Sequence, residues 1–279
     1  MARVGVGLLV TCLVDLMRPR IGFAALKLLE TAGCEVVVPD TQTCCGQPAW
    51  NSGDARGAVA LAKKTIAEFE GFDYVVTPSG SCGEHVRIEY LRLFAGEPGW
   101  RDRATAMASR TYELTDFLVT VLKVEGVPGE HRGSVTYHDS CSGMRGLGIK
   151  QQPRALLAKV KGLSLTEMDG CEECCGFGGT FSVKFGEVSA AIAGRKCDNV
   201  LASGAQAVVG GDLGCLLNIE GKLRRMGDEN TRVLHVAEVL AGSHEPIPQP
   251  VPRSALHSRP AAAAQSMLCE TLPRPRGKG

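Results

Sequence analysis

The sequence has few aromatic residues, almost no net charge and no long run of apolar residues. Aromatic side chains make up 5% of the 279 residues, and 31 basic against 30 acidic side chains leave a formal net charge of +1. A balanced surface of this kind gives no reason to expect nucleic acid or an anionic membrane as a partner. No stretch reaches the roughly 18 apolar residues that a membrane span needs.

The start of the sequence also lacks the marks of a secretory signal. One arginine precedes a short apolar run at residues 4–10, and no small-residue cleavage site follows before Asp15. We therefore expect a cytoplasmic protein without a membrane span. In that reducing compartment, clustered cysteines more often bind metal or perform redox chemistry than form disulfides.

Cysteine is the abundant residue, with 12 in the chain, and its spacing repeats. The first set consists of Cys12, Cys44, Cys45 and Cys82, and the second of Cys141, Cys174, Cys175 and Cys215. Corresponding members lie 129, 130 and 133 residues apart, and each Cys-Cys pair is followed by glycine. Near-constant offsets of this kind indicate a duplicated chain. We predict one half at residues 1–130 and a second at 131–241.

Apolar runs alternate with helical patterns in both halves. Strands are predicted at 4–10, 35–39, 74–77, 134–138, 165–168 and 207–209, and helices at 21–31, 55–69, 153–161, 188–203 and 233–240. This alternation predicts an α/β fold with two homologous, Rossmann-like halves and mostly parallel sheets. The cysteine-bearing turns follow predicted strands, and ligands of such folds bind at the carboxyl ends of strands.

The composition changes after residue 241. Residues 242–279 hold seven of the 14 prolines and a run of four alanines. We predict a disordered tail there, because such a segment buries too little apolar surface to offset the entropy lost on ordering. Cys269 lies in this tail and is not expected to bind a ligand.

The two cysteine sets predict iron–sulfur chemistry. Thiolates select iron–sulfur clusters, zinc or copper(I), and four of them hold a [4Fe-4S] cluster. Adjacent cysteines need a permissive turn to face one cofactor, which Gly46 and Gly176 supply. Structural zinc sites use close C-x₂₋₄-C pairs, and the chain has one such spacing, Cys171 to Cys174. Zinc, a redox-active dithiol and inert buried cysteines remain alternatives; the last is preferred for Cys34 and Cys197.

Several other polar residues are weaker candidates. His138 and Asp139, in the HDSC segment, suit a turn after a strand and could also relay protons or hydrogen-bond a cluster ligand. Arg145, Lys184 and Arg195 could hold a carboxylate substrate, although solvated charges are the default interpretation. No catalytic residue is assigned.

Longer segments around the cysteines resemble a known family. VTCLVDLMRPRIGFAALKLLETAGCEVVVPDTQTCCGQPAWNSGD, YHDSCSGMRGLGI and CCGFGGTFSVKFGEVSAAIAGRK are similar to segments of the lactate utilization protein A family. That family carries the CCG cysteine-rich domain, as do the glycolate oxidase iron–sulfur subunit and the cysteine-rich subunit of heterodisulfide reductase. The resemblance runs from about residue 4 to residue 241.

The resemblance implies an oxidoreductase subunit of a multi-component system that oxidises L-lactate to pyruvate. Its implied partners are a ferredoxin-type iron–sulfur subunit and a third, small subunit, and its implied cofactor is one or two [4Fe-4S] clusters. Because the chain carries no flavin or nicotinamide motif, we expect it to be inactive on lactate alone. A thiol/disulfide reductase subunit, a glycolate oxidase subunit and a zinc-binding scaffold are the alternatives.

The chain departs from the full CCG pattern, which ends in C-x-x-C. His85 and Asn218 stand where that pattern has its fifth cysteine. Four thiolates in each set suit an ordinary cubane cluster better than a five-thiolate noncubane one. Cys171 and His85 are possible additional ligands of iron, although a surface or hydrogen-bonding role is the preferred interpretation of His85.

Overall fold

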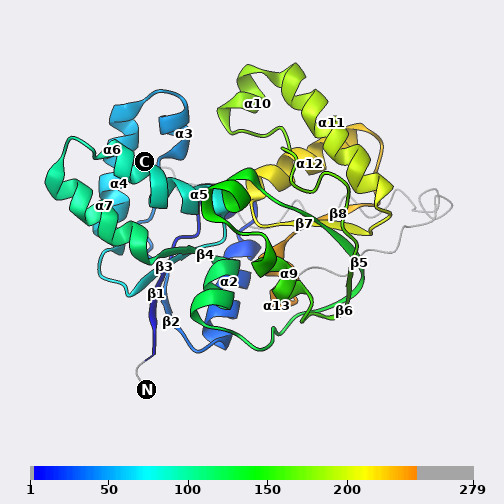
Figure 1. Cartoon of the computed structure of the whole chain (residues 1–279), viewed down its shortest axis with the longest axis horizontal. Helices are drawn as coiled ribbons and strands as arrows, with labels where there is room; N and C mark the ends of the chain where they lie inside the picture. Colours follow the sequence, from blue (N-terminus) through cyan, green and yellow to red (C-terminus); the bar gives the residue numbers. More distant parts are fainter. Residues whose placement is uncertain (1–2, 244–279) are drawn as a thin grey trace, which may run out of the picture. The chain divides into compact units, whose positions relative to one another are not determined.

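Two parallel sheets of four strands, one from each half of the sequence, organise the chain (Figure 1). The computed structural model describes residues 3–243. The strand orders are β2-β1-β3-β4 and β6-β5-β7-β8, and every neighbouring pair is parallel. The predicted α/β fold with two similar, Rossmann-like halves is therefore confirmed.

The first sheet is interleaved with helices. Its elements are β1 (Gly5–Leu8), α1 (Cys12–Met17), α2 (Arg20–Thr31), β2 (Glu35–Val37), α3 (Gln47–Asn51), α4 (Ala55–Phe69), β3 (Tyr74–Thr77), α5 (Gly80–Glu84), the π-helical η1 (His85–Glu89), α6 (Tyr90–Leu93), α7 (Pro98–Arg110), β4 (Thr111–Glu113), α8 (Leu114–Asp116) and the π-helical η2 (Phe117–Val121).

The second sheet repeats this scheme with fewer helices. Its elements are β5 (Glu130–His138), the π-helical η3 (Ser142–Gly146), α9 (Gln151–Leu157), β6 (Lys161–Leu165), α10 (Thr180–Lys184), α11 (Gly186–Ala202), β7 (Ala207–Gly210), α12 (Leu213–Arg225), β8 (Arg232–His235) and α13 (Val236–Ala241).

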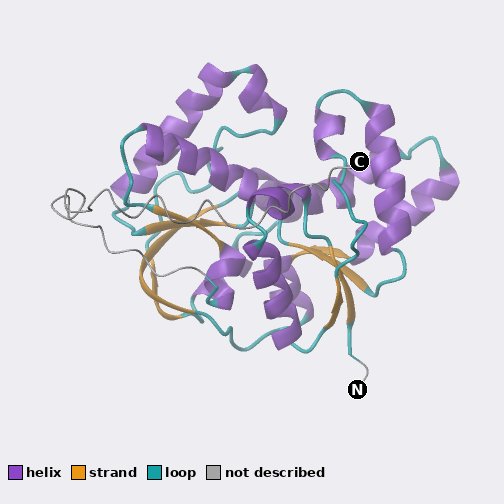
Figure 2. Ribbon diagram, turned by 180° about the vertical axis from the view of Figure 1, so that it is seen from behind, coloured by secondary structure: helices purple, strands orange, loops and turns teal. Residues whose placement is uncertain are grey.

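Helices α2 and α13 pack side by side between the two sheets (Figures 1 and 2). The buried face of α2 carries Ile21, Ala24, Ala25, Leu28 and Leu29, at the spacing that places side chains on one face of a helix. One hydrophobic core joins these residues to buried residues of both sheets. A smaller core, including Phe69 and Tyr90, lies within the first half. The two halves therefore fold against one another as one unit rather than as separate bodies.

Three predicted elements in the second half are shifted or merged. The helix expected at 153–161 ends at Leu157, and the strand expected at 165–168 is wrong because β6 covers Lys161–Leu165. Gly162, the second residue of this strand, has a positive φ of 81°, and the pairing of the strand with β5 is irregular, which obscures its apolar pattern. The stretch at 233–240 combines β8 with α13, since His235 caps a new helix there. The division of the halves near residue 130 stays a prediction; β5 begins at Glu130.

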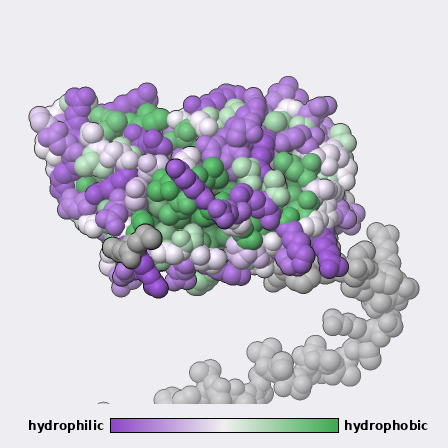
Figure 3. All heavy atoms as spheres, turned by 60° about the horizontal axis from the view of Figure 1, so that its bottom comes forward, coloured by the Kyte–Doolittle hydropathy of each residue, from purple (hydrophilic) through white to green (hydrophobic). Residues whose placement is uncertain are grey.

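The C-terminal region is described only as far as Ser243, so the tail expected at 242–279, with Cys269, lies almost wholly outside the described residues. Within residues 3–243 no helix has both the length and the apolarity to cross a membrane. On the face shown in Figure 3, hydrophobic residues gather near the centre and hydrophilic residues surround them.

Glu113, at the end of β4, is a buried carboxyl group whose burial raises its pKa to about 7. Its Oε2 accepts hydrogen bonds from the backbone N–H groups of Thr115 (2.8 Å) and Asp116 (3.2 Å). Its Oε1 has no hydrogen-bond partner within the described part of the chain. The folded protein therefore favours the protonated form of this side chain.

We expect E113Q to stabilise the protein at pH 8 and to leave its stability unchanged near pH 4. The folded pKa of Glu113 lies above the ordinary 4.5, so the native state loses stability as pH rises from about 4.5 to about 7. The glutamine variant has no such penalty, and the difference in unfolding free energy at pH 8 is about 3 kcal/mol. Urea unfolding at both pH values measures it. An equal difference at both values would contradict the assignment to Glu113.

Candidate functional site

Four cysteines lie where the central strands of the two sheets end. Cys12 begins α1 just beyond β1, and Cys82 lies in α5 just beyond β3. In the second half, Cys141 follows β5 and Cys215 lies in α12 beyond β7. Strands β1 and β3 are neighbours in the first sheet, and β5 and β7 are neighbours in the second. After the first strand of each pair the chain continues to one edge of the sheet, and after the second strand it continues to the opposite edge. That position is the topological switch point, where open α/β sheets bind ligands.

Side-chain caps fix the turns that carry these cysteines. Thr11 accepts from the N–H of Val14 and holds an uncommon positive φ of 78° directly before Cys12. Ser79 accepts from the N–H of Cys82 at 3.4 Å. Asp212 accepts from the N–H of Gly214 at 3.3 Å. Each cap satisfies a helix N–H group and so orients the thiol that follows.

The two Cys-Cys-Gly turns are alike. Gly46 has φ 95° and Gly176 has φ 86°, a region that glycine enters without strain. The N–H of Gly46 donates to Cys44 Sγ at 3.5 Å, and the N–H of Gly176 donates to Cys174 Sγ at 3.3 Å. The positive φ turns the backbone so that both sulfur atoms of each pair reach one cavity, as the glycines predicted.

Side chains from neighbouring helices hold these turns in place. The Tyr90 hydroxyl donates to the carbonyl of Cys45 at 2.7 Å. Asn218 Nδ2 donates to the carbonyl of Cys175 at 2.8 Å. Asn218, which occupies the position of a fifth cysteine in the family pattern, thus supports the turn from the second half's α12.

We expect Gly176→Ala to cost roughly 2–4 kcal/mol of stability. A Cβ there lies 2.6 Å from the Ser189 carbonyl oxygen, so the alanine adds overpacking to the strain of a positive φ. Gly227 has the same φ of 86° with nothing within 4 Å of its Cβ, and Gly227→Ala isolates the backbone cost of about 1 kcal/mol. Urea unfolding of the cluster-free proteins compares them. Equal costs would show that close packing at Gly176 is unimportant.

All eight cysteines of the two sets line one cavity of about 470 Å³. The cavity is also lined by hydroxyl, amide and apolar side chains, and Asp212 is the one charged residue in the lining that the structure describes. Cys45, Cys175 and Cys215 are buried, whereas Cys141 and Cys174 are exposed. The structure thus brings the two sets together across the halves, which their separation in sequence does not predict.

The thiols of each set interact directly. Hydrogen bonds from the thiols of Cys12 and Cys45 lower the pKa of Cys44. The same hydrogen bonding, with burial, raises the pKa of Cys12 and of Cys45. In the second set, donation to Cys175 raises the pKa of Cys174, and burial raises that of Cys141. Sulfur atoms this close can hold one cofactor together.

The charged residues expected as possible carboxylate ligands do not line the cavity, although Arg145 lies close enough to Cys174 to interact with it electrostatically. None of Arg145, Lys184 and Arg195 is among the residues described as lining the cavity. The cavity therefore offers no cationic side chain from residues 3–243 to an anionic substrate.

His85 is fully buried beside the first set, so the surface alternative of its predicted surface or hydrogen-bonding role is wrong. Neither ring nitrogen has a hydrogen-bond partner among the described residues, and the ring packs edge-on against Tyr90. Burial lowers its pKa to about 4, so the ring is neutral at neutral pH. It does not line the cavity, but it lies close enough to Cys44 to interact electrostatically.

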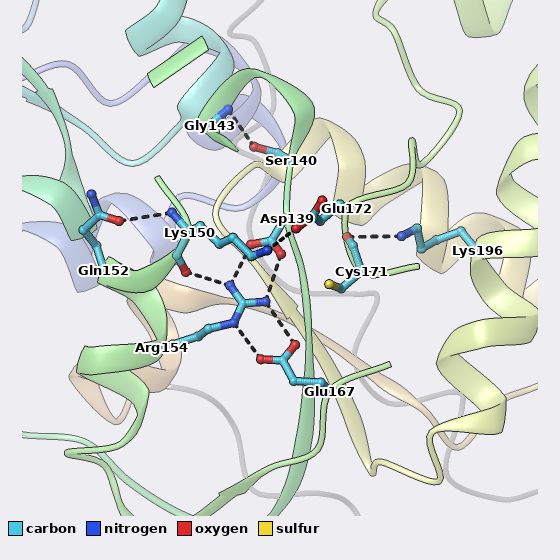
Figure 4. A network of polar contacts seen from close by, with 10 residues as sticks. All are labelled: Asp139, Ser140, Gly143, Lys150, Gln152, Arg154, Glu167, Cys171, Glu172 and Lys196. Atoms are coloured by element: carbon cyan, nitrogen blue, oxygen red, sulfur yellow. Dashed lines mark hydrogen bonds and ion pairs between the residues drawn. The ribbon is translucent and has the colours of Figure 1, made fainter. Parts of the chain in front are cut away.

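Cys171 takes part in a network of polar contacts through its backbone carbonyl (Figure 4). Its carbonyl accepts from the Asp139 N–H at 3.1 Å and from Lys196 Nζ at 3.3 Å. It is not among the residues that line the cavity. That Cys171 is an additional ligand of iron stays a prediction, and its position outside the cavity lining does not favour it.

Arg154 ties the strand end before Cys141 to the loop before Cys174 (Figure 4). Its guanidinium donates to both oxygens of Asp139 at 2.8 and 2.9 Å and also to Glu167. Asp139 is buried, and such bidentate pairs are the strong, geometrically specific ones. This contact supports a structural role for Asp139 in the turn after the strand, rather than a role in relaying protons.

His138 is the residue whose importance the sequence underrated. A ring nitrogen of His138 and the Sγ atoms of Cys175 and Cys215 lie within 4.8 Å of one another. Burial lowers its pKa to about 3, so it faces these sulfur atoms as a neutral ring. The signal was its place at the end of a buried strand, three residues before Cys141.

Two further cysteines behave as small apolar residues. Cys34 and Cys197 are buried in the shared core and do not line the cavity. Cys197 Sγ lies 3.6 Å from the carbonyl oxygen of Ile219. This agrees with the interpretation of both as inert packing residues.

Comparison with known proteins gives consistent matches. The cysteine-rich domain (CCG) pattern matches residues 6–87 and 135–220. Lactate utilization protein A of Bacillus subtilis (strain 168) is 48% identical over 235 residues, covering 84% of this chain and 98% of that protein. Proteins of that name from Bacillus cytotoxicus and Geobacillus sp. (strain WCH70) are 47% and 48% identical with the same coverage.

One solved structure, a hypothetical protein from Helicobacter pylori, covers 86% of this chain and 49% of its own. Its TM-score is 0.48 at 13% sequence identity, which is too remote to support an argument.

Proposed function

Because this chain belongs to the lactate utilization protein A family, with its two cysteine-rich domains, we propose that it is an iron–sulfur subunit of a system that oxidises L-lactate to pyruvate. The chain would hold a [4Fe-4S] cluster on each cysteine set and relay electrons between partner proteins. The observation that carries the proposal is the convergence of eight free thiols on one cavity.

The donor set fits iron–sulfur clusters in number and kind. Four thiolates in each half, Cys12, Cys44, Cys45 and Cys82, and Cys141, Cys174, Cys175 and Cys215, match the four ligands of a cubane. When bound, each cluster supplies one-electron chemistry. The chain itself would contribute the N–H groups of Gly46 and Gly176 toward sulfur and the burial of Cys45 and Cys175. Such contacts tune the reduction potential.

The exposure of the second set supports a relay. Cys141 and Cys174 are exposed, so a cluster held by them would lie at the surface, within reach of a partner. The partners we propose are a ferredoxin-type iron–sulfur subunit and a third, small subunit. A cytoplasmic location is part of this proposal, because clustered cysteines in that reducing compartment bind metal or perform redox chemistry more often than they form disulfides.

Lactate itself would be oxidised elsewhere in the assembly. The cavity lining contains the Asp212 carboxylate and no lysine, arginine or histidine within residues 3–243. Such a site disfavours a second carboxylate, since the two negative charges repel. The chain therefore would receive electrons rather than bind the substrate.

The test is lactate-dependent reduction followed by visible absorption under anaerobic conditions. The loaded chain alone is expected to keep its colour when lactate is added, and to bleach only with its partner proteins present. Bleaching of the isolated chain by lactate would contradict the proposed division of labour. A colourless protein holding zinc would instead favour the scaffold.

A thiol/disulfide reductase subunit is the second candidate. The partly apolar lining between the two thiol sets, with one carboxylate and no cation among the described residues, suits a disulfide better than an anion. A spectral change on adding a disulfide, in the absence of lactate and partners, would favour this candidate over the relay.

A further inference from the structure

Asp212 is the one carboxylate placed between the two thiol sets in the described part of the cavity lining. It follows β7 in the second half, is 5% exposed and lines the shared cavity. Its Oδ1 accepts from the N–H of Gly214 at 3.3 Å, in its own half. Its Oδ2 accepts from the N–H of Ser81 at 2.8 Å and from the Ser79 hydroxyl at 3.3 Å, both in the first half.

The two N–H groups that donate to Asp212 belong to residues that directly precede a cysteine of each set. Gly214 comes before Cys215, and Ser81 comes before Cys82. A carboxylate has two acceptor oxygens and no donor, so it can satisfy an N–H group on each side. Its two oxygens are thus divided between the two halves of the chain.

The duplicated halves differ at this position. Ser79 precedes Cys82 by three residues, as Asp212 precedes Cys215. The Ser79 hydroxyl accepts from the N–H of Cys82 at 3.4 Å within its own half. It also donates across to Asp212. In these contacts between the halves, the accepting oxygen therefore belongs to Asp212 of the second half, and the donors belong to the first half.

The backbones beside this bridge are already in close contact. A Cβ built on Gly80, in α5, would lie 2.9 Å from Cα and N of Gly143 in η3. The turn carrying Cys82 therefore meets the turn after Cys141 through a pair of glycines. Little freedom remains for one half to move without the other.

We propose that Asp212 is a positioning residue that locks the Cys82 turn of the first half to the Cys215 turn of the second. Its substitution then loosens a cysteine in the other half of the chain. For the loaded protein, and resting on the proposed function, the same carboxylate places one negative charge beside both clusters and lowers both reduction potentials.

The first test uses the cluster-free, full-length protein and the variant D212N. Asparagine keeps the size of the side chain but offers one uncharged oxygen, so one N–H group faces the amide NH₂ and the other keeps only a weaker, neutral acceptor. Iodoacetamide labelling followed by mass spectrometry measures each thiol. We expect alkylation of both Cys82 and Cys215 to accelerate about five-fold, as the loss of a buried hydrogen bond implies.

Three controls make the result specific. S79A removes the cap of Cys82 but leaves both Asp212 oxygens, and is expected to accelerate Cys82 alone. D54N weakens an equivalent cap on α4, where Asp54 accepts from the N–H of Gly57 at an exposed site, and is expected to change neither. Slow alkylation of the buried Cys197 in every variant reports that the fold is intact. Acceleration of only one of Cys82 and Cys215 in D212N, or of neither, would overturn the proposal.

The second test uses the anaerobically reconstituted protein. D212N is expected to raise the reduction potentials of both clusters, because removal of a negative charge favours the reduced state. A shift in the reduction potential of one cluster alone would contradict the proposal that the Asp212 charge lies beside both clusters. If the wild-type chain binds no iron, the proposed function fails, while the alkylation test still decides the role of Asp212.

Discussion

Cys175→Ser is expected to halve the iron content of the reconstituted protein, from about eight to about four irons per chain. Cys175 is buried between Cys174 and Cys215, and its loss leaves three thiols in the second set. A serine hydroxyl is a poor ligand for iron compared with a thiolate. The first set, which shares no cysteine with the second, should load as before. Iron and acid-labile sulfide analysis measures the loss.

The matched variants separate the two halves. Cys45→Ser occupies the corresponding position in the first half and should also leave about four irons, but with the spectrum of the other cluster. Cys197→Ser removes a buried thiol that does not line the cavity, and should leave the iron content unchanged. Loss of all iron in Cys175→Ser would mean that both sets hold one shared group. Unchanged iron would remove the second set from the site.

Lactate-dependent electron transfer in the complete system should fall, in either Cys45→Ser or Cys175→Ser, to the rate of the mixture that lacks this chain. The reason is that a relay works in series, so loss of one cluster breaks it as completely as loss of both. The measurement is anaerobic reduction of a dye by lactate with all partner proteins present. Cys197→Ser again serves as the control.

The alternative outcome for this experiment is equally informative. Full activity in Cys45→Ser with none in Cys175→Ser would restrict the relay to the second set, whose Cys141 and Cys174 are exposed. Full activity in both variants would contradict a role of the clusters in electron transfer.

Much of the site follows from local sequence. Apolar runs before Cys12, Cys82, Cys141 and Cys215 indicated strands, and parallel strands deliver such residues to one edge of a sheet. The glycines after the Cys-Cys pairs indicated left-handed turns, and Gly46 and Gly176 hold them. These features depend on residues close together in the chain.

Short or weakly patterned elements could not be predicted from the sequence. β4 has three residues, Thr111–Glu113, and α7, Pro98–Arg110, buries only Ala104, Met107 and Ala108. The bounds of β6 were misjudged because its second residue, Gly162, is a glycine with a positive φ of 81°. Neither length nor periodicity was sufficient to detect these elements.

Relations between the halves could not be predicted at all. The meeting of both thiol sets in one cavity depends on the packing of α2 against α13. The bridge from Asp212 to Ser81 spans 131 residues of sequence. His138 reaches Cys175 and Cys215 only because three separate turns converge. Spacing in a sequence carries no information on such contacts unless the tertiary fold is known.

Metal analysis of the anaerobically purified and reconstituted protein, joined to its paramagnetic-resonance spectrum, tests the central claim most directly. Two four-thiol sets predict about eight irons and eight sulfides per chain, with cubane signals. Because both sets line one cavity, the two reduced clusters should also broaden each other's signals through magnetic interaction. Stoichiometric zinc, with no iron after reconstitution, would contradict the redox function and leave a zinc-binding scaffold.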